Sequence, residues 1–434
     1  MKNIGIIGLG YVGLTLAVVC LEKGYNVFGV EIDSNIKKHL SENKAHFFEP
    51  GIDRLINEYS KKSFRFADKF EDDMNIDAFI VTVGTPLIEN TKEPNYEYLK
   101  MAIGSILNLY TGKELIILRS TVSVGTTRKV VLPLLAQISG KSEDDLLVAF
   151  CPERTIEGKA IAELRELPQI IGANNEEAMV MATEFFGKIT PNLVKVDSLE
   201  AAELVKLFNN TYRDISFAIG NVFNSIAQSF HIDGIKIIED ANYGYKRSNI
   251  PMPGFVGGPC LEKDPYILTY RMGHSEENEF IINAREYNKS LEDKVVAWVK
   301  KMNMKDSLIT ISGLAFKGEP NTSDLRGSNA VEIAKKLKAA GYKLVLHDFY
   351  AKKNELEELA LGQVCGELHE AIQNSSILLI LNNNFQYSNI KLEELITSMK
   401  TPIKILDVWN VFACQFIEKK EIKIYNIGNM DMEV

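Results

Sequence analysis

A cysteine in a glycine-rich, charged segment is the strongest chemical signal in the sequence. Residues 254–264 read GFVGGPCLEKD, so glycines precede Cys260 and the charged residues Lys263 and Asp264 follow it. Glycines allow a substrate to approach the sulfur closely, and a nearby cation lowers the pKa of a thiol and enriches the nucleophilic thiolate. The pattern predicts that Cys260 is a covalent nucleophile. The alternative for any cysteine is a small buried hydrophobe, which we expect for Cys20, Cys151, Cys365 and Cys414.

Polar residues also recur at helical spacing within a long apolar pattern. Lys206, Asn210 and Arg213 stand at positions i, i+4 and i+7, so a helix would place them on one face. We expect this face to be half-buried because apolar side chains flank it: Leu204, Val205, Leu207 and Phe208. A lysine and an asparagine in such a place can stabilise developing oxyanion charge. The alternative is a solvated polar stripe with no chemical role.

Three loops that follow predicted strands carry further polar residues. They are VGTP at 83–86, RSTVSVGT at 119–126 after a strand at 115–118, and CPER at 151–154 after a strand at 146–150. Ligands of α/β sheets bind at the carboxyl ends of the strands. Glu153 is therefore a candidate general base and Thr121 a candidate hydrogen-bonding partner. Judged singly, each is more often an ordinary turn residue.

These loops need a sheet to position them, and the N-terminal residues predict its first strands. An apolar strand at 4–7 precedes GLGYVG at 8–13, a helical pattern follows from 14 to 22, and a second strand at 25–30 ends at Glu31. Three glycines between a strand and a helix, with an acid 21 positions after the second glycine, are typical of dinucleotide-binding folds. An acid at this place also favours NAD over NADP, because it repels a 2′-phosphate.

Each glycine of this loop has its own physical reason. Gly8 makes the turn, Gly10 lets backbone N–H groups approach a pyrophosphate, and Gly13 lets the helix pack on the strand. A tight turn without a ligand would explain one glycine, but not all three together with Glu31.

The same plan returns downstream in altered form. A strand at 308–312 precedes GLAFKG at 313–318, and a later strand ends at Asp348. Ala315 replaces the middle glycine and Lys317 is new, so a pyrophosphate cannot sit as deep, but an ammonium stands where phosphates would lie. We predict a binder of a different phosphate ligand. Further elements complete its parallel sheet: a helix at 328–340, strands at 377–381 and 403–407, and a helix at 392–399.

A helical stretch separates the two copies. Residues 199 to about 230 contain no proline and one glycine, which predicts one long helix, and a second helical run covers 277–302. The expected fold is α/β, with two Rossmann-like, doubly wound parallel-sheet domains joined by a helical core. The expected domains are 1–198, which binds the dinucleotide, 199–304, which is helical and forms a dimer, and 305–434, the second Rossmann-like domain.

Composition limits the class of protein. The chain has 434 residues and a net charge of −9, which argues against nucleic acid as a partner because phosphates need a basic patch. The N-terminus lacks the pattern of a signal peptide, and no apolar run approaches the ~18 residues of a membrane span. Five scattered cysteines and six dispersed histidines predict neither disulfides nor a metal site. A reducing cytoplasm fits best.

Together these motifs resemble those of the nucleotide-sugar 6-dehydrogenases, the UDP-glucose and UDP-N-acetylhexosamine dehydrogenase family. The resemblance covers nearly the whole chain and rests on GLGYVG, VGTP, STVxxGT, CPER, AELVKLFNN, GGPCLEKD and GLAFKG…DLRGS in this order. It implies two Rossmann-like domains and a helical dimer core. It also implies a four-electron oxidation. The C6 alcohol of a UDP-sugar gives a hydride to NAD, the catalytic thiol captures the aldehyde, a second NAD oxidises the thiohemiacetal to a thioester, and water releases the acid.

The resemblance assigns site residues motif by motif. It implies a nucleophile, an oxyanion-stabilising pair, an acid that positions water or orients the lysine, and a pair for proton transfers through water: Cys260, Lys206 with Asn210, Asp264, and Glu153 with Thr121. The implied NAD contacts are Gly8, Gly10, Tyr11, Val12, Gly13, Glu31, Thr85, Thr121, Lys263 and Arg326. The implied UDP-sugar contacts are Glu153, Arg154, Lys206, Asn210, Arg213, Arg247, Gly257 and Lys317.

Two departures bear on the identity of the sugar. The glucose branch of the family commonly has SPEFL where this chain has CPERT at 151–155, and D-x-R-N where this chain has DVWN at 407–410. The chain looks closest to the UDP-N-acetylmannosamine branch, in which an arginine follows the catalytic glutamate. The Arg154 guanidinium could bond the acetamido carbonyl of such a sugar, or turn towards the diphosphate. UDP-N-acetylglucosamine and UDP-glucose stay open as alternative substrates.

Two other kinds of protein would share the first domain. A single-step hydroxy-acid or sugar-phosphate dehydrogenase needs no Cys260 and consumes one NAD per turnover. A non-catalytic NAD-binding protein would leave the joint presence of Cys260, Lys206 and Glu153 unexplained.

Overall fold

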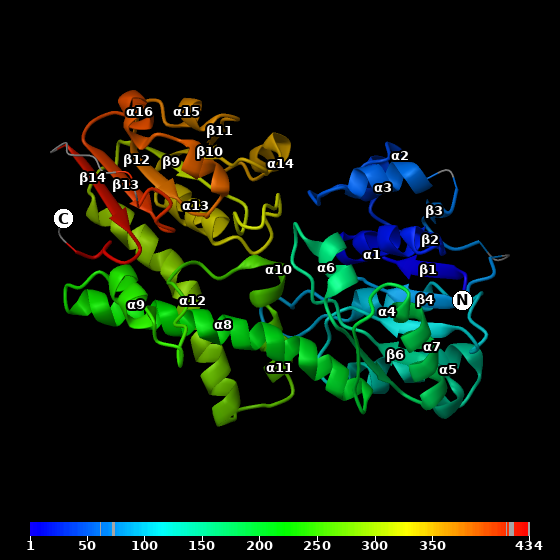
Figure 1. Cartoon of the computed structure of the whole chain (residues 1–434). Helices are drawn as coiled ribbons and strands as arrows, with labels where there is room; N and C mark the ends of the chain where they lie inside the picture. Colours follow the sequence, from blue (N-terminus) through cyan, green and yellow to red (C-terminus); the bar gives the residue numbers. More distant parts are fainter. Residues whose placement is uncertain (61, 72–73, 414, 416–420, 433–434) are drawn as a thin grey trace. The chain divides into compact units, whose positions relative to one another are not determined.

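The computed structural model describes residues 1–434 except 61, 72–73, 414, 416–420 and 433–434, so Cys414 lies outside the described residues. The chain divides into two compact units (Figure 1). Unit 1 is Met1–Asn209 with Tyr266–Gly273, and unit 2 is Asn210–Pro265 with His274–Val434. In the described part of the chain, no helix has the length and apolar character that a membrane span requires.

Unit 1 is built on a sheet with the strand order β3-β2-β1-β4-β5-β6-β7-β8. Its first six strands are parallel and follow the order of dinucleotide-binding folds, whereas β7 runs antiparallel to β6. The central strands are apolar throughout, as parallel strands covered on both faces must be. The strands are β1 (Asn3–Ile7), β2 (Asn26–Val30), β3 (Phe64–Ala67), β4 (Ala78–Val81), β5 (Leu115–Leu118), β6 (Val148–Phe150), β7 (Gln169–Ala173) and β8 (Leu193–Lys195).

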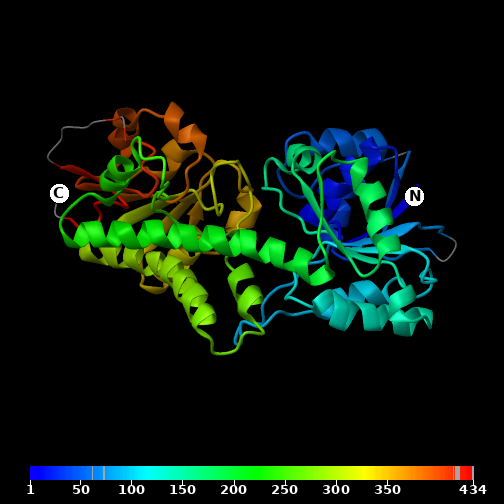
Figure 2. The same ribbon diagram turned by 60° about the horizontal axis from the view of Figure 1, so that its bottom comes forward.

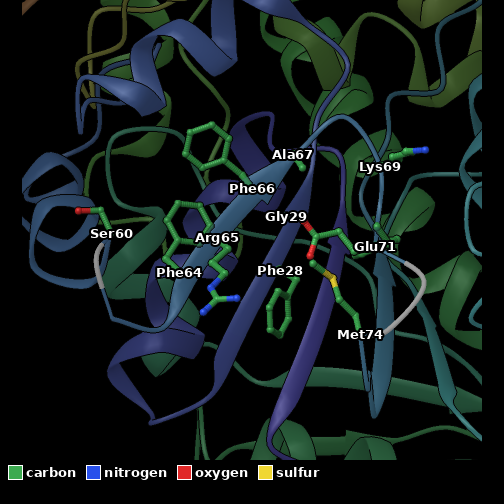
Figure 3. A pocket seen from close by; sticks show the side chains of 11 residues that line it. Phe28, Gly29, Ser60, Phe64, Arg65, Phe66, Ala67, Lys69, Glu71 and Met74 are labelled. Carbon is green, nitrogen blue, oxygen red and sulfur yellow. The ribbon is translucent and has the colours of Figure 1, made fainter.

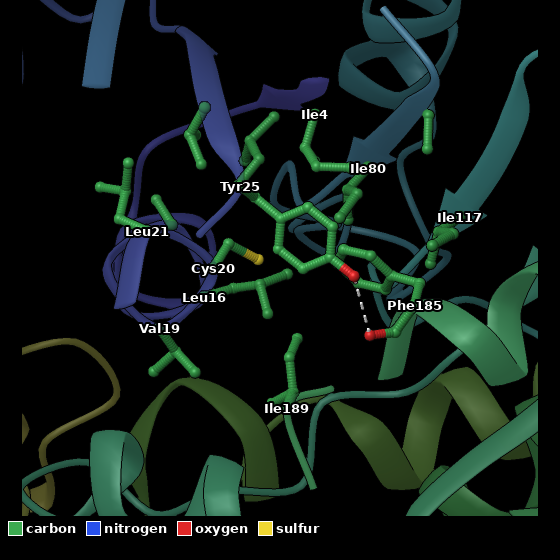
Figure 4. Close-up of a cluster of buried hydrophobic side chains, with 14 of the residues drawn as sticks. Ile4, Leu16, Val19, Cys20, Leu21, Tyr25, Ile80, Ile117, Phe185 and Ile189 are labelled. Carbon is green, nitrogen blue, oxygen red and sulfur yellow. Dashed lines mark hydrogen bonds between the residues drawn. The ribbon is translucent and has the colours of Figure 1, made fainter. Parts of the chain in front are cut away.

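The helices of unit 1 enclose an apolar core. Leu16 and Cys20 of the first helix lie against the ring of Tyr25, whose hydroxyl donates to the Phe185 carbonyl at 3.3 Å (Figure 4). Cys20 and Cys151 are buried, as expected, and burial raises the pKa of each thiol to about 12, whereas Cys365, also expected to be buried, is partly exposed. The helical elements are α1 (Tyr11–Glu22), α2 (Ser34–Ser41), α3 (Ile52–Tyr59), α4 (Glu97–Gly104), η1 (Thr127–Val131), α5 (Leu132–Ser139), η2 (Glu143–Asp145), α6 (Ala160–Glu166) and α7 (Glu176–Gly187).

Unit 2 repeats the plan with a sheet in the order β11-β10-β9-β12-β13-β14, in which every pair is parallel. The strands are β9 (Leu308–Ser312), β10 (Lys343–His347), β11 (Gln363–Val364), β12 (Ser375–Ile380), β13 (Ile403–Asp407) and β14 (Ile422–Asn426). Its shorter helical elements are α9 (Gly234–Asn242), α10 (Gly258–Leu261), α13 (Asn329–Ala339), α14 (Lys353–Glu358), α15 (Leu368–Ala371), η3 (Phe385–Asn389), α16 (Leu392–Leu395) and η4 (Ile396–Ser398).

Two long helices and one short helix complete the chain. Helix α8 spans Leu199–Ser229 and α12 spans Glu276–Lys301, while α11 covers Asp264–Thr269. The second half of α8 lies alongside α12 (Figure 2), and the Tyr287 hydroxyl of α12 donates to Ser225 Oγ of α8 at 2.7 Å. Ser275 caps α12 by accepting from the Asn278 N–H at 3.2 Å. The two parallel-sheet α/β parts and the long helix confirm the predicted fold class.

One predicted helix is shorter in the structure, and the predicted domain boundaries differ from the two compact units. The helix predicted at 392–399 is only α16 followed by the 3-10 turn η4, because the Lys400 N–H donates to the Ser375 carbonyl at 2.9 Å and so draws the chain into β13. The chain forms two compact units, and the boundary between them lies inside α8, after Asn209. The division into domains 1–198, 199–304 and 305–434 therefore stays a prediction.

Candidate active site

The glycine loop of unit 1 has the geometry that each of its glycines predicted. Gly8 has φ +89°, a value that side-chain-bearing residues rarely adopt. A Cβ on Gly13 would lie 1.9 Å from the Gly8 carbonyl oxygen, whereas a Cβ on Gly10 would meet nothing within 4 Å. Gly13 is thus required for packing of α1 on the loop. Gly10 borders open space, into which a ligand can come close to the backbone.

A cavity of about 340 Å³ adjoins this loop. Gly8 and Gly10 line it together with Glu31 at the end of β2 and with Tyr98 and Met101 of α4. The Glu31 carboxylate is fixed because it accepts from the Leu9 N–H at 2.7 Å and the Asp33 N–H at 2.9 Å. An open backbone approach, a fixed carboxylate and apolar walls fit the pyrophosphate, ribose and adenine of NAD.

Tyr11, a predicted NAD contact, uses its side chain within the protein. Its hydroxyl donates to Glu49, accepts from the Gly158 N–H at 3.0 Å, and its ring packs on Phe47 at 4.5 Å between centroids. Burial, then the hydrogen bond to Glu49, raises the pKa of this hydroxyl. Its neighbour Val12 is partly buried. Nothing in the sequence singled out Glu49, whose partners lie far from it along the chain.

Glu153, the candidate base, forms a buried ion pair with Arg119 that no local sequence pattern indicates. Arg119 Nη2 donates to Glu153 Oε2 at 2.5 Å, and the two side chains are 1% and 9% exposed. Burial alone would raise the pKa of Glu153. The Arg119 charge, the Thr155 N–H and the charge of Lys206 outweigh burial and hold this pKa below its usual value. The ion pair with Arg119 and the lowered pKa both favour the carboxylate form of Glu153.

Of the other predicted residues of unit 1, Lys206 and Arg154 interact electrostatically with Glu153. Lys206 is buried, and the Thr85 hydroxyl donates to the Thr121 carbonyl at 2.5 Å, which ties two strand-end loops together. The Arg154 guanidinium donates to the Pro168 carbonyl and, at 3.3 Å, to Asn209 Oδ1. Arg154 is thus already engaged by the protein.

In unit 2, the glycines before Cys260 serve packing, a role that the sequence-based prediction did not include. A Cβ on Gly254 would lie 2.8 Å from the Trp409 ring, and one on Gly258, where φ is +90°, would lie 2.5 Å from the Phe316 ring. A Cβ on Gly257, a predicted substrate contact, would lie 2.4 Å from the Gly327 carbonyl oxygen. The glycines let the loop pack on the second Rossmann-like sheet, while Cys260 in α10 is exposed.

Asn210 and Asp264, predicted catalytic residues, contact each other. Asn210 Nδ2 donates to Asp264 Oδ2 at 2.6 Å, and both residues are buried. The other oxygen, Oδ1, is buried and accepts no hydrogen bond from the described residues. A buried carboxylate oxygen in this state is costly, so it is available to a water, a lysine or a substrate. Lys263, between Cys260 and Asp264, is half-buried.

The predicted polar face of α8 is corrected at one residue. Lys206 and Asn210 are buried but Arg213 is exposed, and Phe208, expected to flank the stripe, is 56% exposed. Asp214 continues the buried face instead, because it stands four residues after Asn210.

Asp214 belongs to a buried network that holds the Cys260 loop. Arg285 of α12 donates through Nη1 to Asp214 Oδ1 at 2.6 Å and through Nη2 to the Val256 carbonyl at 2.9 Å. Asn221 bonds both N–H and C=O of Gly254, at 2.9 and 3.1 Å. These residues carry no local sequence signal, because their partners lie 29 to 71 positions away.

Three other predicted contacts lie elsewhere in unit 2. Lys317 lies over the Phe316 ring at 5.4 Å, and the exposed Arg326 pairs with Asp324 at 2.5 Å. Arg247 lies over the Tyr245 ring at 5.0 Å in an exposed loop. The structure thus describes two groups of predicted catalytic residues, each within its own unit: Glu153, Lys206 and Thr121 in unit 1, and Cys260, Asn210 and Asp264 in unit 2.

Two further observations complete the description of possible sites. Among the described residues, no three His, Cys, Asp or Glu side chains come together as metal ligands. A second hollow of about 360 Å³ lies along the edge strand β3, where Phe28, Arg65 and Met74 line one side (Figure 3). It contains none of the predicted site residues.

Comparison with known proteins assigns the chain's parts. Three models of the UDP-glucose/GDP-mannose dehydrogenase family match in chain order: the NAD binding domain at residues 2–190, the central domain at 200–290 and the UDP binding domain at 310–413. The UDP-N-acetyl-D-mannosamine dehydrogenase of Methanocaldococcus jannaschii is 32% identical over 99% of this chain and 97% of its own length.

Solved structures agree with this assignment. The UDP-D-ManNAc dehydrogenase of Pyrococcus horikoshii is 29% identical, with a TM-score of 0.87 over 99% of this chain and all of that one. The UDP-N-acetyl-mannosamine dehydrogenase of Staphylococcus aureus is 26% identical, with a TM-score of 0.85 and 99% coverage of both chains. The match to an NAD binding domain over 2–190 agrees with the glycine loop, the cavity and Glu31 described above.

Replacing Glu31 should change the choice of cofactor. The carboxylate repels a 2′-phosphate, so the unaltered protein should prefer NAD to NADP. Glu31→Gln should lower the ratio of kcat/KM for NAD to kcat/KM for NADP about tenfold or more. Asp33→Asn, next to it in the chain, is the matched control and should leave the ratio in place. Equal kcat/KM with NAD and NADP in the unaltered protein would refute the role given to Glu31.

Proposed function

This chain belongs to the UDP-glucose/GDP-mannose dehydrogenase family, and we propose that within it the chain oxidises C6 of UDP-N-acetyl-D-mannosamine to UDP-N-acetyl-D-mannosaminuronate, a precursor of surface polysaccharides. The observation that carries the proposal is the exposed Cys260 in a loop fixed by buried polar residues, in a chain that also has an NAD binding domain. The relatives named for this reaction match over nearly their whole length, which supports the choice of sugar.

The proposed chemistry is that of a thiol acting on an aldehyde. NAD, when bound, accepts the hydride in each of the two oxidations. The C6 alcohol first loses a hydride from carbon and a proton from oxygen, which gives the aldehyde. The Cys260 thiolate then attacks the aldehyde carbon and forms a sulfur–carbon bond, and the resulting oxyanion takes up a proton to give a thiohemiacetal. Loss of the remaining C6 hydrogen as hydride and of the hydroxyl proton gives the thioester. Water then adds to its carbonyl carbon, the sulfur–carbon bond breaks, and the acid leaves.

We propose a separate role in this chemistry for each of the charged and polar residues. In the proposal, Lys206 and Asn210 stabilise the oxyanion that forms when sulfur or water adds to the carbonyl. Asp264 holds the Asn210 amide at 2.6 Å and keeps Oδ1 for the attacking water. Glu153, held as an anion, accepts a hydrogen bond from a water that relays protons together with Thr121.

The sugar's acetamido group is the feature that distinguishes the substrates. We propose that Arg154 contacts this group by exchanging its long 3.3 Å bond to Asn209 for the acetamido carbonyl, while its bond to Pro168 keeps the side chain in place. A site that satisfies a buried polar partner rejects a substrate without that partner.

Steady-state kinetics with a panel of sugars tests this proposal. The kcat/KM for UDP-N-acetylmannosamine should exceed that for UDP-glucose about 100-fold or more, with UDP-N-acetylglucosamine between them. Arg154→Ala should lose most of this preference, whereas Arg165→Ala, an arginine paired with Glu22 on the same unit, should keep it. A higher kcat/KM for UDP-glucose would contradict the proposed substrate.

We also propose a homodimer formed through the helical part of unit 2. Large apolar side chains on one side of α8 are exposed at helical spacing: Tyr212 at 73%, Ile219 at 44%, Phe223 at 42% and Ile226 at 51%. A contiguous apolar stripe of this kind marks a protein interface. In a two-fold dimer the same surface of both subunits forms the interface, so the stripe on α8 of one copy would pack against the stripe on α8 of the other.

Sedimentation measurements on the purified chain test the dimer. The unaltered protein should sediment as a dimer at micromolar concentration, and Phe223→Glu should shift it to monomer because a charge would be buried in the interface. Ile88→Glu, at a residue of unit 1 with the similar exposure of 43%, is the matched control and should stay dimeric. A monomeric unaltered protein, or a dimeric Phe223→Glu variant, contradicts the proposal.

A reducing compartment, the cytoplasm, is the proposed place of this reaction. The nucleophile must be a thiol, and the cysteines that the structure describes at 20, 151, 260 and 365 form no disulfide.

A further inference from the structure

Arg119 is a buried cation to which the proposed reaction assigns no role. It stands directly after β5 and is 2% exposed. Its guanidinium donates to Glu153 Oε2 at 2.5 Å and to Gln169 Oε1 at 2.9 Å, and it lies 5.3 Å from the centroid of the Phe186 ring. A cation enclosed in this way is costly unless it is paired, so its place is fixed by the pair it forms.

The two side chains that accept from Arg119, Gln169 and Glu153, are themselves held by further hydrogen bonds. Gln169 is the first residue of the antiparallel strand β7, which brings it to the edge where β5 and β6 end. Its amide donates to the Ile170 carbonyl at 2.8 Å and to the Pro152 carbonyl at 3.3 Å, so the oxygen that Arg119 contacts cannot turn away. Glu153 Oε1 accepts from the Thr155 N–H at 2.7 Å. The two carboxylate oxygens of Glu153 are therefore held from two sides.

We propose that Arg119 is a positioning residue that holds Glu153 as an oriented carboxylate throughout the reaction, an inference that rests on the proposed function. With one oxygen bonded to Arg119 and the other to a backbone N–H, the carboxylate presents its remaining lone pairs in fixed directions to the water that it orients. Arg119 itself does not need to touch the substrate. It acts through Glu153.

The groups around Glu153 give the sign of the pH effect. Cations face it from three elements: Arg119 from the end of β5, Lys206 from α8 and Arg154 from its own loop. The acid Glu163 of α6 lines the same small hollow and accepts from the Ile156 N–H at 2.7 Å. Burial disfavours the charged form of Glu153 and so raises its pKa. The charge of Arg119 is the largest influence that lowers this pKa. Removing the Arg119 charge must therefore raise the pKa of Glu153.

The test is the pH dependence of kcat for NADH formation from UDP-N-acetylmannosamine. In Arg119→Gln, the acidic limb of the profile should move upward by about 1–3 pH units, because Glu153 becomes protonated at a higher pH. In the double variant Arg119→Gln/Glu153→Gln that limb should be absent, as in Glu153→Gln alone. Arg128→Gln removes an exposed arginine paired with Glu200 and should leave the profile unchanged.

Arg119→Lys keeps the test decisive if Arg119→Gln does not fold. A lysine retains the charge but lacks the planar guanidinium, whose separate N–H groups donate to Glu153 and Gln169 at the same time. The acidic limb should stay at its wild-type position, kcat should fall about tenfold at every pH because the carboxylate is misplaced, and KM for NAD should not change. Wild-type kcat in Arg119→Lys, or an unmoved limb in folded Arg119→Gln, overturns the inference.

The wild-type enzyme separates the two possible failures. If it forms no NADH with any UDP-sugar, the proposed function is overturned, and the role of Arg119 with it. If the wild type is active but Arg119→Lys keeps the wild-type kcat, or the acidic limb of folded Arg119→Gln does not move, only the role of Arg119 is overturned.

Discussion

Buried charges must be paired, and this constraint fixes both loops on which the proposed chemistry depends. In unit 1 the Arg119–Glu153 pair holds the loop that follows β6, and in unit 2 the Arg285–Asp214 pair holds the loop that carries Cys260. Removing one member of such a pair lowers the free energy of unfolding by about 3–5 kcal/mol, because the charge of the other member stays buried without a partner. Both loops are thus held in place by the stability of the fold.

The two sheets show how one plan serves two ligands. Each contains six parallel strands in the order 3-2-1-4-5-6, to which unit 1 adds β7 and β8, and each has a glycine loop after its first strand. In unit 1 the space beside Gly10 is open, whereas in unit 2 Ala315 stands at the equivalent position and its N–H donates to Asp348 at 2.9 Å. Both loops donate an N–H to the acid that ends the next strand, so the difference between them is the Ala315 side chain, which stands where unit 1 leaves open space.

The sequence predicted those parts of the fold and site that local pattern determines. Strands such as β9 and β13, helix α8 and the separate roles of Gly8, Gly10 and Gly13 follow from apolar periodicity and from backbone sterics. The partners of Arg119 and Arg285 could not be predicted, because they are 24 to 71 positions away in the sequence and meet only when the sheet and helices pack. The packing role of the glycines before Cys260 could not be predicted either, because Trp409 and Phe316, against which they pack, are also remote in the sequence.

The most direct test of the central claim is the amount of NADH formed per molecule of acid, measured together for the wild type and two cysteine variants. A thiol that captures the aldehyde predicts two NADH per acid in the wild type and no acid from Cys260→Ala. Cys365→Ala, at a half-buried cysteine of the same unit, should behave as the wild type. One NADH per product molecule, or full acid formation by Cys260→Ala, would contradict a covalent four-electron oxidation.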